Sequence, residues 1–262
     1  MRGLSRVLTG RRLVLAIAAV VAAVAGAGGT ALALTTSAPS HAVAVSRGDL
    51  TRAALKVTAG TPFLDVSMGR LGGTLLRVST PDGAPVRPVL SGSQLIVLSL
   101  AGATGPSGSA NSGGNDPPGL PQDSGYVVKV VLNSAVTWSL DLAGGTQRTQ
   151  VDLRGGKVAG VAVMAGSAVL DVSLPRPSGT LPFLLAGGVS QFRLSLPGGV
   201  PVQVTVGGGA SSVSVDDQRL TGIAGGTVLT PPGWASATSR FDIDAISGFS
   251  QLTVSRWSAA GS

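Results

Sequence analysis

The chain of 262 residues contains no cysteine, no glutamate and a single histidine, and aromatic residues make up only 3% of it. Without cysteine it has no disulfide, no thiolate metal site and no cysteine nucleophile. The one histidine, His41, lies ahead of the strand-like part of the chain, so a Ser–His–Asp triad lacks its base there. The G-x-S-x-G and P-loop motifs are also missing from the sequence. We therefore expect no enzymatic activity, no cofactor and no metal site.

The positive charge does not indicate a nucleic-acid-binding protein. The formal net charge is +7, but four arginines precede the first hydrophobic run: Arg2, Arg6, Arg11 and Arg12. Without them, 15 basic and 12 acidic residues remain, a net charge of +3. Nucleic-acid binders concentrate lysine and arginine on one element, usually with aromatic residues for stacking. Here the remaining basic residues are scattered, so we expect no nucleic-acid partner.

The N-terminus has the pattern of a membrane anchor or an export signal. A basic segment, 1–12, precedes an uncharged run of 22 residues, 13–34. As a helix this run would be about 33 Å long, enough to cross a hydrocarbon core of about 30 Å. The arginines before it would keep the N-terminus inside, which predicts a single-pass protein of the bacterial cell membrane with the rest of the chain outside. The alternative is secretion after cleavage of a signal peptide, since Ala31–Ala33 and Ser40–Ala42 both have the small-x-small form.

The rest of the chain is rich in valine, threonine, serine and glycine, with 39 glycines in all. This composition favours strands and tight turns over helices. Alternation of apolar and polar residues predicts strands in two parts, separated by a Gly/Ser/Pro-rich stretch with too few apolar residues to fold. The predicted divisions are a tether at 35–54, a first β-repeat part at 55–100, a disordered linker at 101–125 and a main β-repeat part at 126–257.

An internal repeat organises both parts. Val57–Leu75 and Val163–Leu181 match at a constant offset of 106 residues. Each belongs to a more general frame, in which a glycine is followed after a short spacer by alternating apolar residues. The leading glycines are Gly60, Gly92, Gly145, Gly166, Gly188, Gly209 and Gly248. The four from Gly145 to Gly209 are spaced by 21, 22 and 21 residues, and the last gap of 39 is about two units.

A period near 21 residues predicts an all-β fold in which short units stack like the rungs of a β-solenoid. Each unit is too small to bury its own apolar face, so neighbouring units together build the core. Glycine at each corner would permit a positive φ or a close approach of neighbouring units. An antiparallel β-sandwich would give similar alternation and remains the alternative.

Several segments of the main part carry a resemblance to a known family. They are Leu174–Thr180, Ala186–Ser190, Leu196–Pro201 and Gly207–Ser211, with the sequences LPRPSGT, AGGVS, LPGGVP and GGGAS. In these segments the chain resembles the toast-rack, or putative-adhesin, β-solenoid family. It is also similar to the C-terminal domains of bacterial membrane proteins that respond to cell-wall-active antibiotics. The resemblance implies a β-solenoid attached to membrane helices and no established activity.

Few residues qualify as site candidates. Trp234, which follows two prolines and a glycine, is the tryptophan most expected to be a surface contact, whereas Trp138 and Trp257 are expected to pack in or cap the fold. Two aspartate pairs, Asp216–Asp217 and Asp242 with Asp244, could ligate Ca²⁺, but too few further oxygen ligands accompany them. We interpret the first pair as a turn and the second as a solvated strand face. The matching Asp65 and Asp171 are expected to face water.

These observations favour a non-enzymatic, membrane-anchored, extracytoplasmic β-repeat protein, adhesin-like or otherwise an interaction module of the cell envelope. Its partners would be the membrane, through residues 13–34, and an envelope protein or cell-wall glycan. Two alternatives stay open. One is a secreted protein that binds or hydrolyses cell-wall glycan, with aspartates as its catalytic groups. The other, which follows from the family resemblance alone, is a membrane protein that regulates the envelope-stress response.

Overall fold

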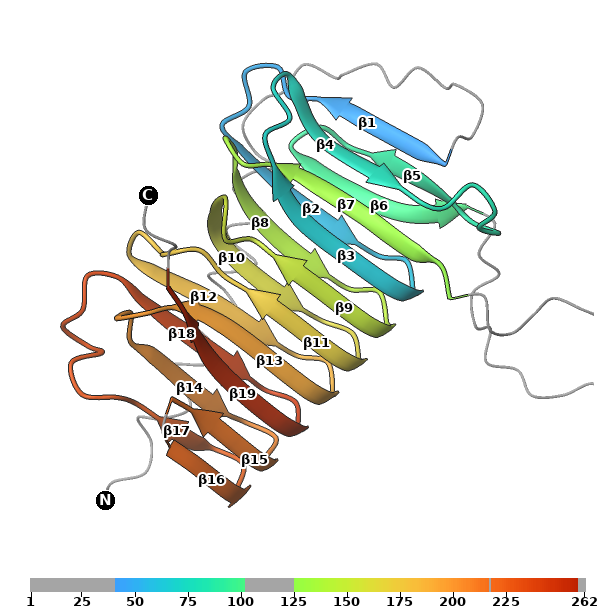
Figure 1. Ribbon diagram of the computed structural model, residues 1–262. Helices are drawn as coiled ribbons and strands as arrows, with labels where there is room; N and C mark the ends of the chain where they lie inside the picture. Colours follow the sequence, from blue (N-terminus) through green and yellow to red (C-terminus); the bar gives the residue numbers. More distant parts are fainter. Residues whose placement is uncertain (1–40, 102–124, 217, 259–262) are drawn as a thin grey trace, which may run out of the picture.

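The computed structural model describes residues 41–101, 125–216 and 218–258, and this part of the chain is all-β (Figure 1). Within these ranges no helix is long and apolar enough to cross a membrane. The predicted basic segment 1–12 and apolar helix 13–34 lie outside the described residues, and so does nearly all of the predicted linker 101–125.

The strands form two mixed sheets. In order across the ten-stranded sheet they are β1 (Ala42–Ser46), β4 (Thr74–Ser79), β7 (Val127–Asn133), β3 (Thr61–Gly69), β9 (Thr146–Asp152), β11 (Ser167–Ser173), β13 (Val189–Pro197), β19 (Phe249–Trp257), β15 (Ala210–Val215) and β16 (Gln218–Ile223). Across the nine-stranded sheet they are β17 (Thr227–Leu229), β14 (Val202–Val206), β18 (Arg240–Ala245), β12 (Thr180–Leu185), β10 (Lys157–Val163), β8 (Thr137–Leu142), β2 (Arg52–Val57), β6 (Leu95–Ala101) and β5 (Arg87–Ser91).

The chain alternates between the sheets, so each predicted unit gives one strand to each of them. From β8 to β15, successive strands lie in the nine-stranded and the ten-stranded sheet in turn. Strands in the middle of both sheets pair in parallel, for example β9 with β11 and β8 with β10. Antiparallel pairs lie at the two ends, as in β1 with β4 and β15 with β16. Parallel stacking in the middle matches the expectation of stacked units, while the ends have the antiparallel pairing of the alternative.

The strand register confirms the glycine-led frame. The residue four positions after each leading glycine lies beside its counterpart in the next strand of the ten-stranded sheet. Across that sheet the row reads Leu64, Thr149, Leu170, Phe192, Leu252 and Val213. The two organising stretches therefore occupy equivalent positions, with β9 between their strands β3 and β11. Gly92 departs from the frame, because it leads into β6 of the other sheet.

The order of strands in space differs from their order in the chain. The last two strands, β18 and β19, lie between β12 and β14 in one sheet and between β13 and β15 in the other. At the other end, β2 and β3 lie between strands that follow them in the sequence. The two predicted β-repeat parts, 55–100 and 126–257, therefore share both sheets.

The predicted tether 35–54 requires a correction. Ala42–Ser46 is strand β1, an edge strand antiparallel to β4, and β2 already begins at Arg52. His41, just before β1, lies with its Nδ1 3.0 Å from the hydroxyl oxygen of Thr80. The stretch escaped prediction because an edge strand of five small residues has little apolar alternation to reveal it.

A continuous apolar core fills the space between the two sheets. Inward positions of both sheets carry leucine, valine and phenylalanine with almost no exposed surface. Phe183 of β12 and Phe192 of β13 stack across the layers with ring centroids 5.3 Å apart. Trp138 is completely buried and its indole N–H donates to the Asn133 carbonyl at 3.0 Å, as expected for a packing residue. The core is thus built from the residues that alternate inward along every unit.

Candidate functional site

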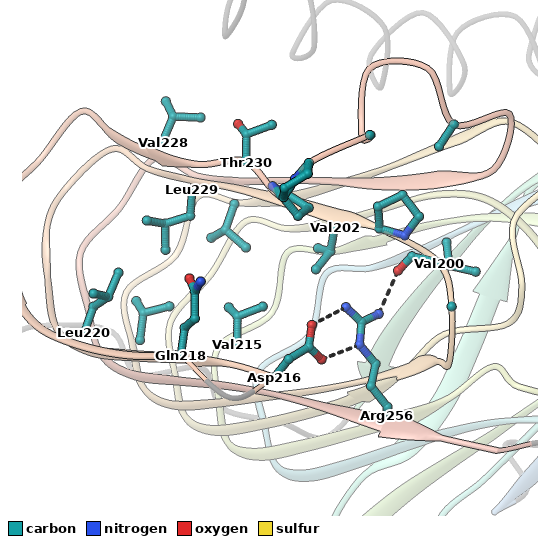
Figure 2. Close-up of a pocket in the computed structure, with 18 residues that line it drawn as sticks. Val200, Val202, Val215, Asp216, Gln218, Leu220, Val228, Leu229, Thr230 and Arg256 are labelled. Carbon is teal, nitrogen blue, oxygen red and sulfur yellow. Dashed lines mark hydrogen bonds and ion pairs between the residues drawn. The ribbon is translucent and has the colours of Figure 1, made fainter.

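A concavity lies at the end of the two-layer stack where the sheets terminate in β16 and β17, and Figure 2 shows the residues that line it. This end cleft has a volume of about 1030 Å³. Aliphatic side chains from both sheets line it, joined by a few polar ones at its rim. The aliphatic residues include Val202, Val204, Val213, Val215, Leu220 and Leu229, and the polar residues are Asp216, Gln218, Thr230 and Arg256.

The cleft exists because the core is not closed at this end. Leu220 pairs with the buried Val213 across β15 and β16, so its side chain faces the opposite sheet. In the middle of the stack such a residue is fully covered, yet Leu220 is 39% exposed. Leu229 of β17 pairs with the buried Val204 and faces the cleft from the other sheet. The next rung, which would cover both leucines, is missing from the described part of the chain.

An ion pair marks one side of the cleft. The Arg256 Nε donates to Asp216 Oδ1 at 2.6 Å, and its Nη2 donates to Asp216 Oδ2 at 3.0 Å. The third guanidinium nitrogen donates to the Val200 carbonyl at 2.8 Å (Figure 2). These bonds from Arg256 lower the pKa of Asp216. Both carboxylate oxygens are occupied by the arginine, so Asp216 is not a free general base and the cleft carries no net charge from this pair.

Asp216 also has an uncommon backbone conformation. Its φ of 51° places it in the left-handed region, at the turn between β15 and β16. Aspartate tolerates this region better than most residues, which fits the sequence interpretation of a turn. Its predicted neighbour in a metal site, Asp217, lies outside the described residues.

The second predicted aspartate pair lies away from the cleft. Asp242 and Asp244 alternate along β18 with the buried Phe241 and Ile243, so they are on the outer face of the nine-stranded sheet. Burial raises the pKa of both carboxyls, and Asp242 raises that of Asp244 further. Asp244 is only 4% exposed, which corrects the expectation of a solvated face, and its Oδ2 has no hydrogen-bond partner. Within the described ranges, no three acidic or histidine side chains are grouped closely enough to hold a metal ion.

Trp234 lies in the loop between β17 and β18, beside the cleft. Its indole N–H donates to the Phe241 carbonyl at 2.7 Å, and the ring is half-buried. The Arg240 guanidinium stacks over the ring, 4.6 Å from the centroid, and its Nη1 donates to the carbonyls of Trp234 and Ala235. These contacts hold the tryptophan in place and leave part of it exposed, so its role as a surface contact stays a prediction.

The remaining predicted residues lie on the strands as expected. Asp65 and Asp171 both point outward, but Gln150 of β9 separates them, so they do not form a continuous acidic ladder. Asp171 forms an ion pair with Arg193 at 3.0 Å. Trp257, at the end of β19, is partly buried and donates to the Leu174 carbonyl at 3.3 Å.

Sequence reasoning did not identify the cleft. Its key residues, Leu220 and Arg256, look like ordinary strand positions in the sequence. The available signal was the 39-residue gap between Gly209 and Gly248, which breaks the period of about 21. That gap contains the antiparallel strands β16 and β17, which end the sheets, as well as the return of the chain into β18.

Chemically, the cleft can bind apolar groups. Its walls offer aliphatic surface, the ion pair among its described lining residues is mutually neutralised, and Gln218 supplies an amide at the rim. Nothing among its described lining residues combines a free acid with a free base. The arrangement is therefore suited to holding an apolar group.

Comparisons with known proteins bear on the fold. No family model and no curated protein matches the chain. Among solved structures, the chain is similar to the crystal structure of a protein from Clostridium sporogenes described as a putative cell adhesion protein. The TM-score is 0.57 at 15% sequence identity, and the match covers 81% of this chain and 97% of the other. At this identity the likeness concerns the fold alone.

Proposed function

We propose that this chain is a non-enzymatic, membrane-attached protein whose β-repeat domain lies outside the bacterial cell and acts as an interaction module of the envelope. The observation that carries the proposal is the end cleft, where the open end of the core presents an aliphatic surface. The charges of Asp216 and Arg256, which line the cleft, neutralise each other. Exposed apolar concavities of this kind in soluble domains are typically binding surfaces.

We also propose that the fold is a β-solenoid of the toast-rack type. The alternation of the chain between two sheets and the parallel register of the glycine-led units support this assignment. The likeness to a protein described as a putative cell adhesion protein is compatible with an adhesin-like role.

Membrane attachment is supported by the arginines of segment 1–12 and the apolar run 13–34. Alkaline extraction of membranes, followed by N-terminal sequencing of the mature protein, tests it. Retention in the membrane with Met1 intact supports an anchor. Release with a new N-terminus near Val43 would replace the anchor with a secreted protein.

The binding role is tested with a matched pair of variants. Leu220 in the cleft and Val89 in β5, at the other end of the molecule, are similarly exposed, at 39% and 42%. The full chain would be used to capture proteins and glycan from envelope fractions. We expect Leu220→Glu to lose a captured partner and Val89→Glu to keep it. Equal capture by both variants would contradict the role assigned to the cleft.

Glycan binding is the second candidate, favoured by the partly exposed Trp234 beside the cleft. Co-sedimentation with cell-wall glycan that Trp234→Ala abolishes would favour glycan binding over a protein partner.

Hydrolysis of glycan has less support, because Asp216 is paired with Arg256 and Asp242 lies on a different face. Turnover of polysaccharides or esters that is lost on Asp→Ala substitution would overturn the non-enzymatic proposal. Co-purification with a sensor kinase would instead favour a role in envelope-stress regulation.

A further inference from the structure

The partner that best fits the end cleft is a second copy of the same chain. We propose that two molecules join through their β16 strands, which pair antiparallel about a two-fold axis at Leu220 and close the two end clefts against each other. This inference rests on the proposed function, since it names a partner for the same site. Four features of β16 and its surroundings carry it.

The first feature is the unprotected edge of β16. Strands at a sheet edge present unpaired backbone groups, and proteins usually protect such edges with proline, several charges or very short strands. β16 is six residues long, has no proline and carries one charged side chain, Arg219. Its counterpart β17 is three residues long and is followed closely by Pro231 and Pro232. At this end of the molecule β16 is therefore the strand suited to backbone pairing.

The second feature is the self-complementarity of the β16 sequence. With the axis at Leu220, the two Leu220 side chains lie opposite each other, Arg219 lies opposite Thr221, and Gln218 lies opposite Gly222. No like charges are directly opposite. The positive φ of Gly222 lies near the end of the strand and leaves the central three pairs regular.

The third feature is the incompleteness of the cleft. Leu220 and Leu229 face the space between the sheets but lack the next rung that covers equivalent residues elsewhere. A second copy related by the two-fold axis brings its own Leu220 to this position. The two cores then continue through the interface, and the apolar surface that each cleft exposes is removed from water.

The fourth feature is electrostatic. Asp216 and Arg256 neutralise each other, so this ion pair does not repel the same ion pair of a second copy. Arg219 pairs with Ser214 and faces the outer side of the sheet, away from the cleft. Across the axis the two Arg219 side chains would be diagonal neighbours, about 7–8 Å apart. Dimerisation should therefore strengthen as salt screens this repulsion, and Arg219→Ser should remove most of the salt dependence.

Because the sequence contains no cysteine, a single introduced cysteine tests the pairing of the two β16 strands directly. Full-length chain in detergent carrying Leu220→Cys would be oxidised mildly and examined for covalent dimer. We expect a crosslinked dimer, because directly opposite residues have Cβ atoms about 4.5–5.5 Å apart, close to disulfide reach. Val89→Cys, at a similarly exposed residue at the far end, is the control and should stay monomeric. This site-specific readout separates pairing through β16 from association through residues 13–34.

A second variant keeps the proposal falsifiable if the cysteine variant folds poorly. Leu220→Lys should halve the mass measured by light scattering, with an unchanged far-ultraviolet circular dichroism spectrum, whereas Val89→Lys should leave the mass unchanged.

A monomer without crosslinking, or equal crosslinking at Leu220 and Val89, would overturn the proposal. So would a monomer that retains an apolar small molecule in native mass spectrometry. If a monomer still captures an envelope partner through Leu220, only the dimer fails. If the chain dimerises through Leu220 but is absent from envelope fractions, the proposed function fails instead.

Discussion

At the residue scale, the corners of the stack depend on the residue just before each leading glycine. In spatial order across the ten-stranded sheet, these residues are Ala59, Gly144, Ala165, Gly187, Ser247 and Gly208. Glycine thus alternates with alanine or serine. A Cβ added at Gly144, Gly187 or Gly208 would overlap the backbone of the unit on one side. The alternation reflects close backbone approach at every second unit, which the positions of the leading glycines alone do not predict.

This geometry predicts different outcomes for substitutions at two adjacent glycines. In Gly187→Ala the new methyl would collide with the backbone of Ala165 and Gly166, whereas in Gly188→Ala it would meet only the Gly248 carbonyl oxygen at 3.8 Å. Overpacking of this kind costs about 1–3 kcal/mol. We therefore expect chemical denaturation to give a reduced free energy of unfolding for Gly187→Ala and little change for Gly188→Ala. Similar losses in both variants would mean that the position before the leading glycine is not the more constrained of the two.

Asp244 predicts an unusual pH dependence. Burial raises the pKa of its carboxyl above the ordinary value of 3.8. The folded state therefore binds a proton more readily than the unfolded state, and the charged form destabilises the fold as the pH rises from about 3.8 through the folded-state pKa. We expect Asp244→Asn to raise the melting temperature at pH 7, with a gain that shrinks towards pH 4. Asp171→Asn, at an outward residue paired with Arg193, is the control and should show no such gain.

At the element scale, much of the fold could be predicted from periodic residues. Strands such as β6 (Leu95–Ala101) and the row from Leu64 to Val213 follow directly from apolar alternation and the leading glycines. The insertion of β18 and β19 between earlier strands could not, because neighbouring units offer nearly the same inward faces to any strand of the repeat. Strand β16 could not be predicted either, because its residues are almost all exposed and no buried face marks it as a strand.

The stacked phenylalanines of β12 and β13 join the two layers. Phe183 and Phe192 belong to different sheets and are both almost completely buried. Phe192→Ala would leave a cavity between the sheets and should reduce the free energy of unfolding by about 3–5 kcal/mol. Phe192→Leu keeps most of the volume and should cost less. Equal losses would argue that the ring stacking, rather than the filled volume, provides the coupling, and denaturant titration of both variants distinguishes these cases.

At the scale of the whole molecule, the end cleft and the strand order have a common origin. The chain leaves β13, builds β14 to β17 at the far end and only then returns as β18 and β19. The end that carries the cleft is thus held to the rest of both sheets by β18 and β19. Its exposed leucines and open core are the outcome of ending the stack with β16 and β17 rather than with a covering helix or loop in the described chain.

This arrangement predicts that removal of β18 and β19 has effects far beyond their own length. Truncation after Ser239 would separate β12 from β14 and β13 from β15, and would uncover Phe183 and Phe192, which pair with neither β14 nor β15 directly. The remaining β14–β17 unit would keep only short antiparallel pairs, too few to be stable alone. We expect limited proteolysis to degrade residues 199–239 while the strands up to β13 resist longer, and a lower melting temperature. Truncation after Ser258, which leaves all strands intact, is the control. If the first truncation melts like the control, the last two strands do not hold the two regions together.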